Sequence, residues 1–454
     1  MMSLMRMLRH RSLIAPLNAA LLLCSAREAS AQLGSFNPPA GPRTTYAIKG
    51  ARVVPVGGAE IANGTVVIVD GKIIAVGVNP AIPAGANVID GKGLVVYPGM
   101  MDAGTSLGLS EISQGAAATV DVSETGSFNP NAQAFFGINP HSAHVGVTRV
   151  VGITHVMSRP TGGIVSGQAA ILNLAGSTAP EMTVVQHEAM VIELPRSGFG
   201  GRGGGFAAAT GGANTQEVNR TRQRQMDSLR TLLKDAEAYG QVIDAYAKDK
   251  GLPRPKQDVV LASLVETVRG KMPVLMIADR ANDIREAVTF AEEMKFKPII
   301  VGGRDAWQIA SFLKSHDVPV LLGTVMDLPS REDDPYDVNF SAPGILAKAG
   351  VRFAITSGDA GAEARNLPYT AGMAAAFGLS KDDALKSVTL WPAQILGVSD
   401  KLGTIEAGKM ANLVVTDGDL LEAKTNTRFL FIDGRPVPLD TKHSVLFEQF
   451  KDRK

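Results

Sequence analysis

The sequence has a single cysteine and almost no net charge. Cys24 is the one thiol in 454 residues, and 45 basic residues balance 44 acidic ones to a formal charge of +1. A lone cysteine cannot build a disulfide framework or a cysteine metal site, and a balanced charge gives no basic face for nucleic acid. Glycine is abundant instead, at 48 residues, while charged side chains make up 20%. That composition suits an α/β protein with many tight turns.

The N-terminus lacks an apolar run long enough to span a bilayer comfortably. A basic start, MMSLMRMLRHRS, precedes the interrupted apolar stretch LIAPLNAALLLCSA, and Ala29 and Ala31 then form an A-x-A cleavage pattern before Gln32. We expect residues 1–31 to be a signal peptide, the protein to be periplasmic or extracellular, and no integral membrane segment to remain after cleavage. The alternative is a disordered or membrane-anchoring start. Lipid attachment at Cys24 is not favoured, because leucines precede it.

Both ends of the chain have the texture of β-hairpins. Residues 45–97 contain β-branched runs around Asn63-Gly64 and Asp70-Gly71, and residues 397–440 contain Asp417-Gly418 and Asp433-Gly434. These dipeptides favour two-residue hairpin turns. We therefore predict one small composite β-sandwich assembled from the two terminal segments, the alternative being two unrelated hairpins.

Between the hairpins, residues 98–396 alternate short apolar runs with amphipathic stretches. KMPVLMIA, KPIIVGG, VPVLLG and VRFAITSG read as buried strands, each separated from the next by a helical pattern. Such alternation over roughly 300 residues predicts an α/β fold with a (β/α)8 TIM-type barrel. An insertion spans about 190–270. It holds a glycine-rich stretch at 198–205, which we interpret as a surface loop rather than a phosphate cradle, and a charged helix at 215–250.

Two long motifs resemble those of the amidohydrolase superfamily, in the branch of imidazolonepropionase and the prolidase-like enzymes. The entry motif is VIDGKGLVVYPGMMDAGTSLG (88–108), and the exit motif is GLSKDDALKSVTLWPAQILGVSDKLGTIEAGKMANLVV (378–415). The resemblance covers nearly the whole expected mature chain. It implies a (β/α)8 barrel with a composite β-sandwich, and metal-dependent hydrolysis of C–N bonds in non-peptide amides, cyclic amides or dipeptides. It also implies zinc or another divalent metal at the carboxyl ends of the barrel strands.

The residues at the family's metal positions break this pattern. The H-x-H pair after the first strand falls on Gly104 and Ser106, the strand-five histidine on Ile277 or its neighbour Ala278, and the strand-six histidine on Gly302. Zinc requires three or four nitrogen, oxygen or sulfur donors at about 2.0–2.3 Å, which these side chains do not offer. We therefore predict no metal or other cofactor. The strand-four position cannot be aligned across the insertion.

The catalytic aspartate of strand eight does have a counterpart. Asp359 in FAITSGDAGAEARN occupies that place, shifted slightly in spacing, and is the candidate proton acceptor.

Other residues could serve a different site. Arg280, Arg304 and Arg365 follow strand ends or lie in the strand-eight loop, with Asp279 and Asn366 beside them, and could bind an anionic small molecule; salt bridges at the barrel rim are the alternative. A rebuilt metal site could use three histidines, although capping or surface roles also suit them: His141, His144 and His155. An improvised nucleophile would be Thr105 or Ser106.

We therefore predict an exported amidohydrolase-like protein in which the family reaction is lost or altered. Its expected role is that of a binding or partner subunit with a small-molecule ligand, either as a homo-oligomer or in complex with a related amidohydrolase. The alternative is an active hydrolase of C–N bonds that uses Asp359 in a non-standard site.

Overall fold

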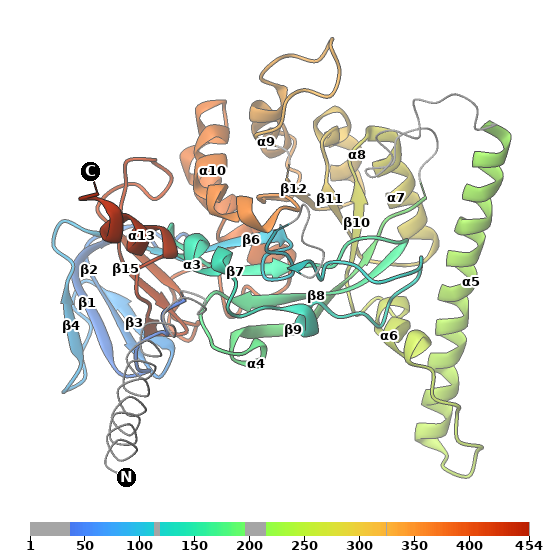
Figure 1. The fold of residues 1–454 in the computed structure, drawn as a ribbon, viewed down its shortest axis with the longest axis horizontal. Coiled ribbons are helices and arrows are strands. Elements are labelled where there is room, and N and C mark those ends of the chain that lie inside the picture. The colour runs from blue at the N-terminus through green and yellow to red at the C-terminus, as the bar shows by residue number, and fades with distance from the viewer. Residues whose placement is uncertain (1–36, 113–118, 196–214, 324, 454) are drawn as a thin grey trace, which may run out of the picture. The chain divides into compact units, whose positions relative to one another are not determined.

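The structure is a computed structural model that describes residues 37–112, 119–195, 215–323 and 325–453 (Figure 1). The chain divides into two compact units, Met1–Phe36 and Asn37–Lys454, and all of the described residues belong to the second unit. The expected signal peptide and the glycine-rich stretch at 198–205 lie outside the described residues. Across the described ranges, no helix is both long and apolar enough to cross a membrane.

The terminal segments together form one eight-stranded sheet. Its strand order is β16-β15-β14-β5-β1-β2-β3, with β4 paired to β1. The antiparallel pairing of β14 with β5 joins the end of the chain to its beginning and confirms the composite β-domain. The strands are β1 (Tyr46–Val53), β2 (Ile61–Val69), β3 (Lys72–Gly77), β4 (Asn87–Asp90), β5 (Val95–Pro98), β14 (Leu413–Thr416), β15 (Thr427–Ile432) and β16 (Arg435–Pro436).

Two of the four predicted turns form, while Asn63-Gly64 does not and Asp417-Gly418 lies in the longer connection between β14 (Leu413–Thr416) and β15 (Thr427–Ile432). Asp70-Gly71 and Asp433-Gly434 both have positive φ at each residue and close the hairpins β2–β3 and β15–β16. Asn63-Gly64 was predicted as a turn as well, but it lies inside β2, where the pairing with β1 is irregular. Gly64 is needed there because a Cβ would crowd Val53 on the neighbouring strand.

The second sheet is an eight-stranded barrel that is nearly closed. Its order is β13-β12-β11-β10-β9-β8-β7-β6, which confirms the TIM-like barrel. The strands are β6 (Met100–Thr105), β7 (Ile153–Ser158), β8 (Val165–Asn173), β9 (Thr183–Ile192), β10 (Val274–Ala278), β11 (Pro298–Gly302), β12 (Val320–Leu322) and β13 (Phe353–Ile355). The strands expected from the apolar runs are β10 to β13.

One barrel strand runs against the others. β8 pairs antiparallel with both β7 and β9, whereas the remaining neighbours pair in parallel. Residues 159–164 and 174–182, which connect it, are too short for a parallel crossover, which takes a dozen residues or more. The carboxyl ends of the other seven strands therefore share one end of the barrel with the amino end of β8.

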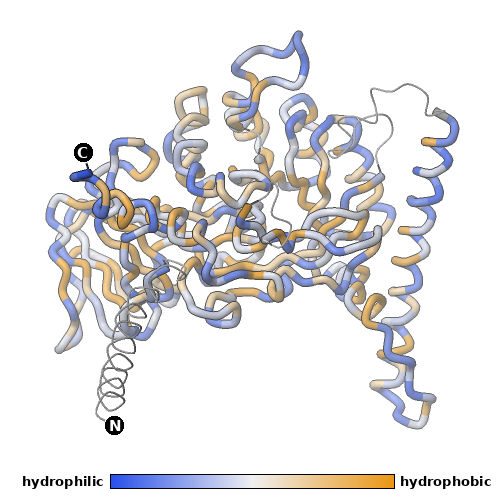
Figure 2. Tube along the Cα trace, in the orientation of Figure 1, coloured by the Kyte–Doolittle hydropathy of each residue, from blue (hydrophilic) through white to orange (hydrophobic). Residues whose placement is uncertain are grey.

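Helices cover the barrel and connect its strands. They are α2 (Ala134–Gly137), α3 (Ala143–Arg149), α4 (Ala179–Met182), α5 (Thr215–Lys248), α6 (Val259–Val268), α7 (Ala281–Glu293), η3 (Ala306–Ile309), α8 (Ala310–Ser315), α9 (Val338–Lys348), η4 (Gly361–Asn366), α10 (Leu367–Ala376), α11 (Lys381–Ser387), α12 (Leu390–Ile395) and α13 (Lys442–Phe450). The predicted charged helix is α5, whose buried stripe includes Met226, Leu229 and Leu233. Figure 2 shows the rest of α5 as mostly hydrophilic.

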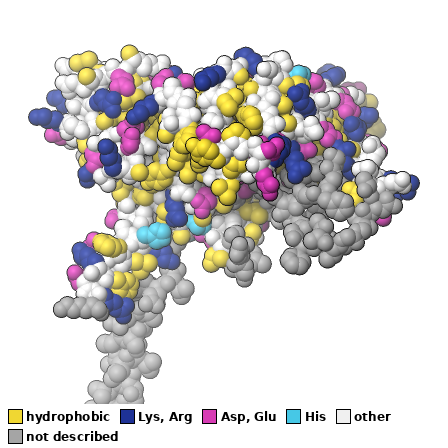
Figure 3. Space-filling model, turned by 90° about the horizontal axis from the view of Figure 1, so that it is seen from above, with side chains coloured by type: hydrophobic (Ala, Val, Ile, Leu, Met, Phe, Trp, Pro, Cys, Tyr) yellow, Lys and Arg dark blue, Asp and Glu magenta, His cyan; other side chains and the backbone are white. Residues whose placement is uncertain are grey.

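The barrel interior is filled by alternate residues of its strands, so it is a packed core and not a pore. Small side chains such as Ala103, Ala169 and Ala189 face larger ones such as Met157 and Leu275. A second layer, between the sheet and the helices, holds the other face of the same strands. On the molecular face in Figure 3, basic and acidic side chains are interspersed, as the balanced composition predicts.

Candidate ligand site at the barrel mouth

Two adjacent cavities open where the carboxyl ends of the strands converge. The larger has a volume of about 450 Å³ and the smaller about 300 Å³. Four residues line both cavities: Arg159, Ile277, Asp359 and Ala360. TIM-barrel chemistry is normally found at this end. These cavities are therefore the place where the family's reaction would occur.

An ion pair between Arg159 and Asp359 stands between the cavities. Arg159 follows β7 directly, and its backbone N–H donates to the carbonyl of Thr105 at the end of β6 over 3.0 Å. Its guanidinium donates through Nη2 to Asp359 Oδ1. The Arg159 side chain is 3% exposed and that of Asp359 is 35% exposed. The Arg159 Nε is buried, with no hydrogen-bond partner among the described residues.

The loop that carries Asp359 is held from two sides. Ser106 Oγ donates to the Asp359 carbonyl over 2.5 Å. Beneath it, the fully buried Asp102 of β6 accepts hydrogen bonds from the hydroxyl and the backbone N–H of Ser357, which follows β13. Burial raises the pKa of Asp102 to about 6, against the lowering effect of its hydrogen bonds and of Arg159. Asp102 thus joins the first strand of the barrel to the loop after the last.

The residues at the family's metal positions do not fit a metal. Gly104, Ile277 and Gly302 have no donor side chain, and the hydroxyl of Ser106 is directed at a carbonyl. Gly302 has a φ of 98°, and a Cβ at that position would overlap the carboxylate of Asp279. The carboxylate of Asp279, which follows β10, therefore fills the space that a side chain at position 302 would occupy. Nowhere in the described ranges do three histidine, cysteine, aspartate or glutamate residues group to hold a metal ion.

Arg280, Arg304 and Arg365 were candidates for a pocket that binds an anionic small molecule, and that role stays a prediction. None of the three lines either mouth cavity. Arg280 and Arg365 are exposed to solvent, and Arg304 pairs with Asp327, the rim salt bridge considered as its alternative. Arg159, one residue past β7, is the arginine that faces the cavities.

The histidines are also separated. His144 lines the larger cavity and its Nε2 lies 2.9 Å from the carbonyl of Glu111, so that nitrogen carries the proton. His141 is exposed, so the two do not form a pair of ligands. His155, the third candidate ligand of a rebuilt metal site, pairs with Asn173 at the opposite end of the barrel. Complete burial lowers the pKa of His155 to about 3 and keeps it neutral.

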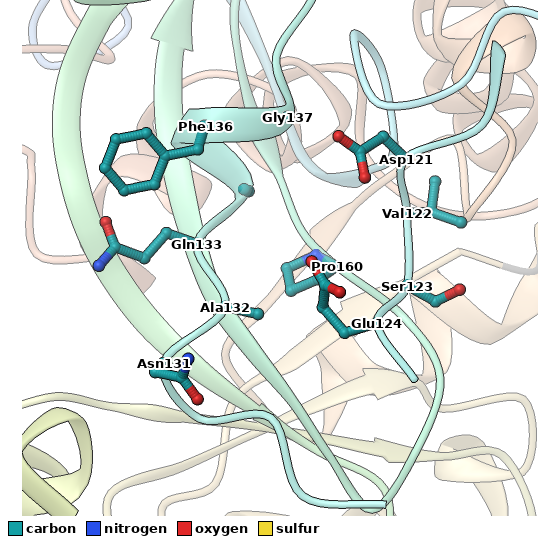
Figure 4. A pocket seen from close by; sticks show the side chains of 11 residues that line it. Asp121, Val122, Ser123, Glu124, Asn131, Ala132, Gln133, Phe136, Gly137 and Pro160 are labelled. Atoms are coloured by element: carbon teal, nitrogen blue, oxygen red, sulfur yellow. The ribbon is translucent and has the colours of Figure 1, made fainter. Parts of the chain in front are cut away.

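A third cavity, of about 260 Å³, adjoins the mouth (Figure 4). Figure 4 shows Asp121 and Glu124 on one segment facing Asn131 to Gly137 on another, with Pro160 between them. Pro160 follows Arg159 in the chain, so this cavity and the mouth cavities are lined by consecutive residues of one loop. The side chains that line it include carboxylates and amides but no lysine or arginine.

The sequence reasoning missed Arg159 and Asp102. Arg159 follows an apolar strand run, ITHVMS, without a turn residue between them, and that position at a strand end is the signal that could have identified it. Asp102 lies in the entry motif two residues before Gly104, but nothing local indicates that it would be buried.

The comparisons with known proteins agree with this fold. The model of the amidohydrolase family matches residues 316–439. The imidazolonepropionase of Mesorhizobium japonicum is 25% identical over 394 residues, which is 79% of this chain and 87% of that protein. An amidohydrolase structure from Thermotoga maritima is 26% identical with a TM-score of 0.75, covering 87% of this chain and 99% of that one. A prolidase crystallised with N-methylphosphonate-L-proline is 20% identical, covers 87% and 99% of the two chains with a TM-score of 0.53, and shows the shared fold.

The barrel and the composite sheet form the fold of an amidohydrolase-type protein. The matches support the amidohydrolase superfamily, as the entry and exit motifs predicted.

Proposed function

We propose that this chain is a ligand-binding member of the superfamily in which metal-dependent C–N hydrolysis is lost or altered. The observation that carries the proposal is the ion pair between Arg159 and Asp359. In the family, metal cations polarise the scissile bond and the aspartate accepts the proton of the attacking water. Here the aspartate is occupied by a buried guanidinium, and the positions of the metal ligands carry no donors.

Arg159 supplies a fixed positive charge to the mouth without binding a water for attack. A metal ion lowers the pKa of its bound water and so generates a nucleophile at neutral pH, whereas a guanidinium is a donor only. The cavities retain a size typical of small-ligand sites, together with polar and apolar walls. Binding of a small molecule is therefore supported, while the family's means of water activation is not.

Hydrolysis assays test the proposal directly. The purified chain should show no turnover of dipeptides, N-acyl amino acids or cyclic amides above that of its Asp359→Asn variant. Ligand binding at the mouth should still be detectable by calorimetry. Turnover of any of these substrates that disappears in Asp359→Asn would overturn the proposal.

That same outcome would establish the second candidate function, an active hydrolase with a non-standard site. The observation in its favour is that Asp359 lines both cavities and is about one-third exposed, so its carboxylate can be reached from either side. In that case Asp359 accepts a proton after Arg159 has turned to the substrate.

We also propose that the chain is exported and works as a partner subunit, either with copies of itself or with a related amidohydrolase. The support is the N-terminal pattern and the retention of the whole barrel around an altered site. Native mass measurement on protein isolated from the periplasm of its host should give a particle larger than a single processed chain, which is itself lighter than the 47.6 kDa of the full sequence. A monomer under those conditions would contradict the partner role.

A further inference from the structure

The C-terminal helix α13 has an apolar face that no other part of the described chain covers. None of its nine residues is buried. Four of its side chains are large, apolar and exposed: Val445 by 37%, Leu446 by 40%, Phe450 by 44% and Phe447 by 65%. One exposed apolar side chain is normal on a protein surface, whereas a contiguous group of them marks an interaction site.

Three of these side chains point away from the rest of the molecule. Residues three or four positions apart lie side by side on a helix, so Leu446 and Phe447 both neighbour Phe450. We call these three residues the α13 face. Thr441, the buried N-cap, and Ser444, the only half-buried residue of the helix, lie on the opposite side and hold α13 next to α3 (Figure 1). The α13 face is therefore directed toward solvent.

Basic side chains lie along both edges of the α13 face. Lys442 begins the helix at one edge, and Lys451 caps its end at the other. The guanidinium of Arg453 lies 5.2 Å from the centroid of the Phe450 ring. The one acidic residue of the helix, Glu448, lies on the attached side and pairs with Lys451 over 2.6 Å. An apolar surface with cations at its edges and the acidic group behind it fits a partner that is apolar inside and anionic at its surface.

A second copy of the chain does not suit the α13 face. Both edges are basic, so two copies would place like charges opposite each other. A stable interface also buries about 800 Å² on each partner, and one phenylalanine supplies only about 150–250 Å² of that area. Two phenylalanines and one leucine fall short even when they are fully buried.

We propose that α13 docks the chain on the surface of an anionic lipid bilayer. The helix lies in the plane of the interface, where the α13 face enters the boundary between head groups and acyl chains. The basic side chains extend outward to the lipid phosphates while their alkyl stems stay in apolar contact. One short helix gives reversible docking. This function is separate from the barrel mouth, because no residue of α13 lines either mouth cavity.

Vesicle binding tests the proposal on the chain that starts at Gln32. This chain lacks the apolar residues 1–31, which could bind lipid themselves, and it retains the whole compact unit from Asn37 onward. Its partition onto phosphatidylcholine vesicles with about 30% phosphatidylglycerol should exceed that onto pure phosphatidylcholine by about tenfold, since each basic residue near an anionic surface strengthens binding. Raising the salt from about 0.1 M to about 1 M should remove most of this difference, because the Debye length falls from about 10 Å to about 3 Å.

A variant of the α13 face tests its apolar contribution. Phe447→Ser should lower the partition onto anionic vesicles about tenfold, because the ring is the most exposed apolar group of the helix. Phe136→Ser is the matched control, since the Phe136 ring on α2 is 75% exposed. The control should bind vesicles as the parent chain does. Neither side chain is buried, so both variants should fold, which their thermal melts check.

A second pair of variants tests the basic edges. The double variant Lys442→Gln/Lys451→Gln should bind anionic vesicles about tenfold more weakly and should lose most of the salt dependence. Lys49→Gln/Lys92→Gln is the matched control, because it removes the same charge from two exposed positions in the composite β-domain. It should keep the binding and the salt dependence of the parent chain.

Several results would overturn membrane docking by α13. These are equal binding to both kinds of vesicle, no binding to either, or parental binding by Phe447→Ser. A dimer that dissociates on the Phe447→Ser substitution would assign the α13 face to a second copy and overturn the proposal as well. Hydrolysis that depends on Asp359 would overturn the proposed function alone, because vesicle binding does not involve the barrel mouth.

Discussion

Arg159 is charged, almost fully buried and paired with a single carboxylate, and these properties determine how its neighbourhood should respond to substitution. Asp359 is about one-third exposed, so it can be hydrated when its partner is lost, whereas Arg159 cannot. The two halves of the pair should therefore contribute unequally to stability. Removing one member of a buried pair is costly mainly because of the charge that remains.

We predict that Asp359→Ala destabilises the fold by about 2 kcal/mol or more, while Arg159→Met costs about 1 kcal/mol or less. The double variant should be more stable than Asp359→Ala alone, because methionine removes the unpaired charge and keeps much of the volume. Chemical denaturation of the three variants measures this. Additive losses in the double variant would show that the buried charge is not the cause.

Gly302 shows a different constraint at the residue scale. Its φ of 98° is unfavourable for any side chain, and a Cβ would meet the Asp279 carboxylate. Gly302→Ala should therefore lower the stability by about 1–3 kcal/mol. Gly77→Ala is the matched control, since Gly77 lies at a strand end with open space around its Cα. Equal effects of the two substitutions in thermal melts would contradict the strain at Gly302.

At the scale of elements, the side chain of Asp102 connects the first and last strands of the barrel. The hydrogen-bonded order of the sheet runs from β13 to β6 around the barrel, and the described structure has no backbone ladder between those two end strands. Asp102 bridges this seam by accepting two hydrogen bonds from Ser357. The stability of this seam should therefore depend on whether the buried carboxyl group of Asp102 is charged.

The pH dependence of stability follows from the raised pKa. Asp102 has a folded-state pKa of about 6 and an ordinary value of 3.8 when exposed, so the folded state binds the proton more tightly. This contribution is fully present below about pH 4 and is lost as the pH rises through 6. Glu188, whose pKa burial raises to about 7, acts in the same direction.

We predict that Asp102→Asn removes part of this slope. Between pH 4 and 7, the wild-type chain should lose roughly 3 kcal/mol of stability relative to Asp102→Asn, since each pKa unit corresponds to about 1.4 kcal/mol. Denaturant unfolding at several pH values for both proteins measures the difference. Parallel pH profiles would mean that Asp102 has the same pKa in the folded and unfolded chain.

Sequence patterns predicted those strands and turns that are determined by residues close together in the sequence. The apolar runs of β10 to β13 and the Asp-Gly turns at 70–71 and 433–434 form where expected. The reversed strand β8 was not predicted, because its direction depends on the length of its two connections, which periodicity does not reveal. Asn63-Gly64 failed as a turn because the pairing with β1 continues through it.

The site was predictable only where a motif marked it. The strand-eight motif singled out Asp359, which lines both mouth cavities, and its catalytic role stays a prediction. Arg159 was not found, because its partner is distant in sequence and no family position predicts a cation there. Arg159 is the first residue after its strand, whereas the three expected arginines lie further past the ends of theirs. The position after the strand end, and not the residue type, therefore distinguishes the arginine that lines the cavities.

At the scale of the whole molecule, the described unit begins at Asn37, a few residues after the predicted cleavage site. The Asn37 side chain donates to the carbonyl of Pro140, and the buried Arg149 donates to the carbonyl of Pro38. The start of this unit is thus fixed on the barrel by hydrogen bonds that do not involve the leader. Removal of residues 1–31 should leave those contacts in place.

We predict that the mature chain starts at Gln32 or within a few residues of it. N-terminal sequencing or intact-mass analysis of protein from the host's periplasm identifies the start. The processed chain should melt within about 1 °C of a chain expressed from Gln32. Recovery of the chain with its Met1 end in soluble cytoplasm would contradict export.

The central claim is that a guanidinium has taken the place of a metal centre, and metal content tests it most directly. The chain should be purified without chelators and examined by elemental analysis, followed by thermal melts with and without a chelator. We predict far less than about one transition metal per chain, and an unchanged melting temperature because no metal-binding free energy contributes to folding. Stoichiometric zinc that is lost on chelation, together with several degrees of stability, would contradict the account.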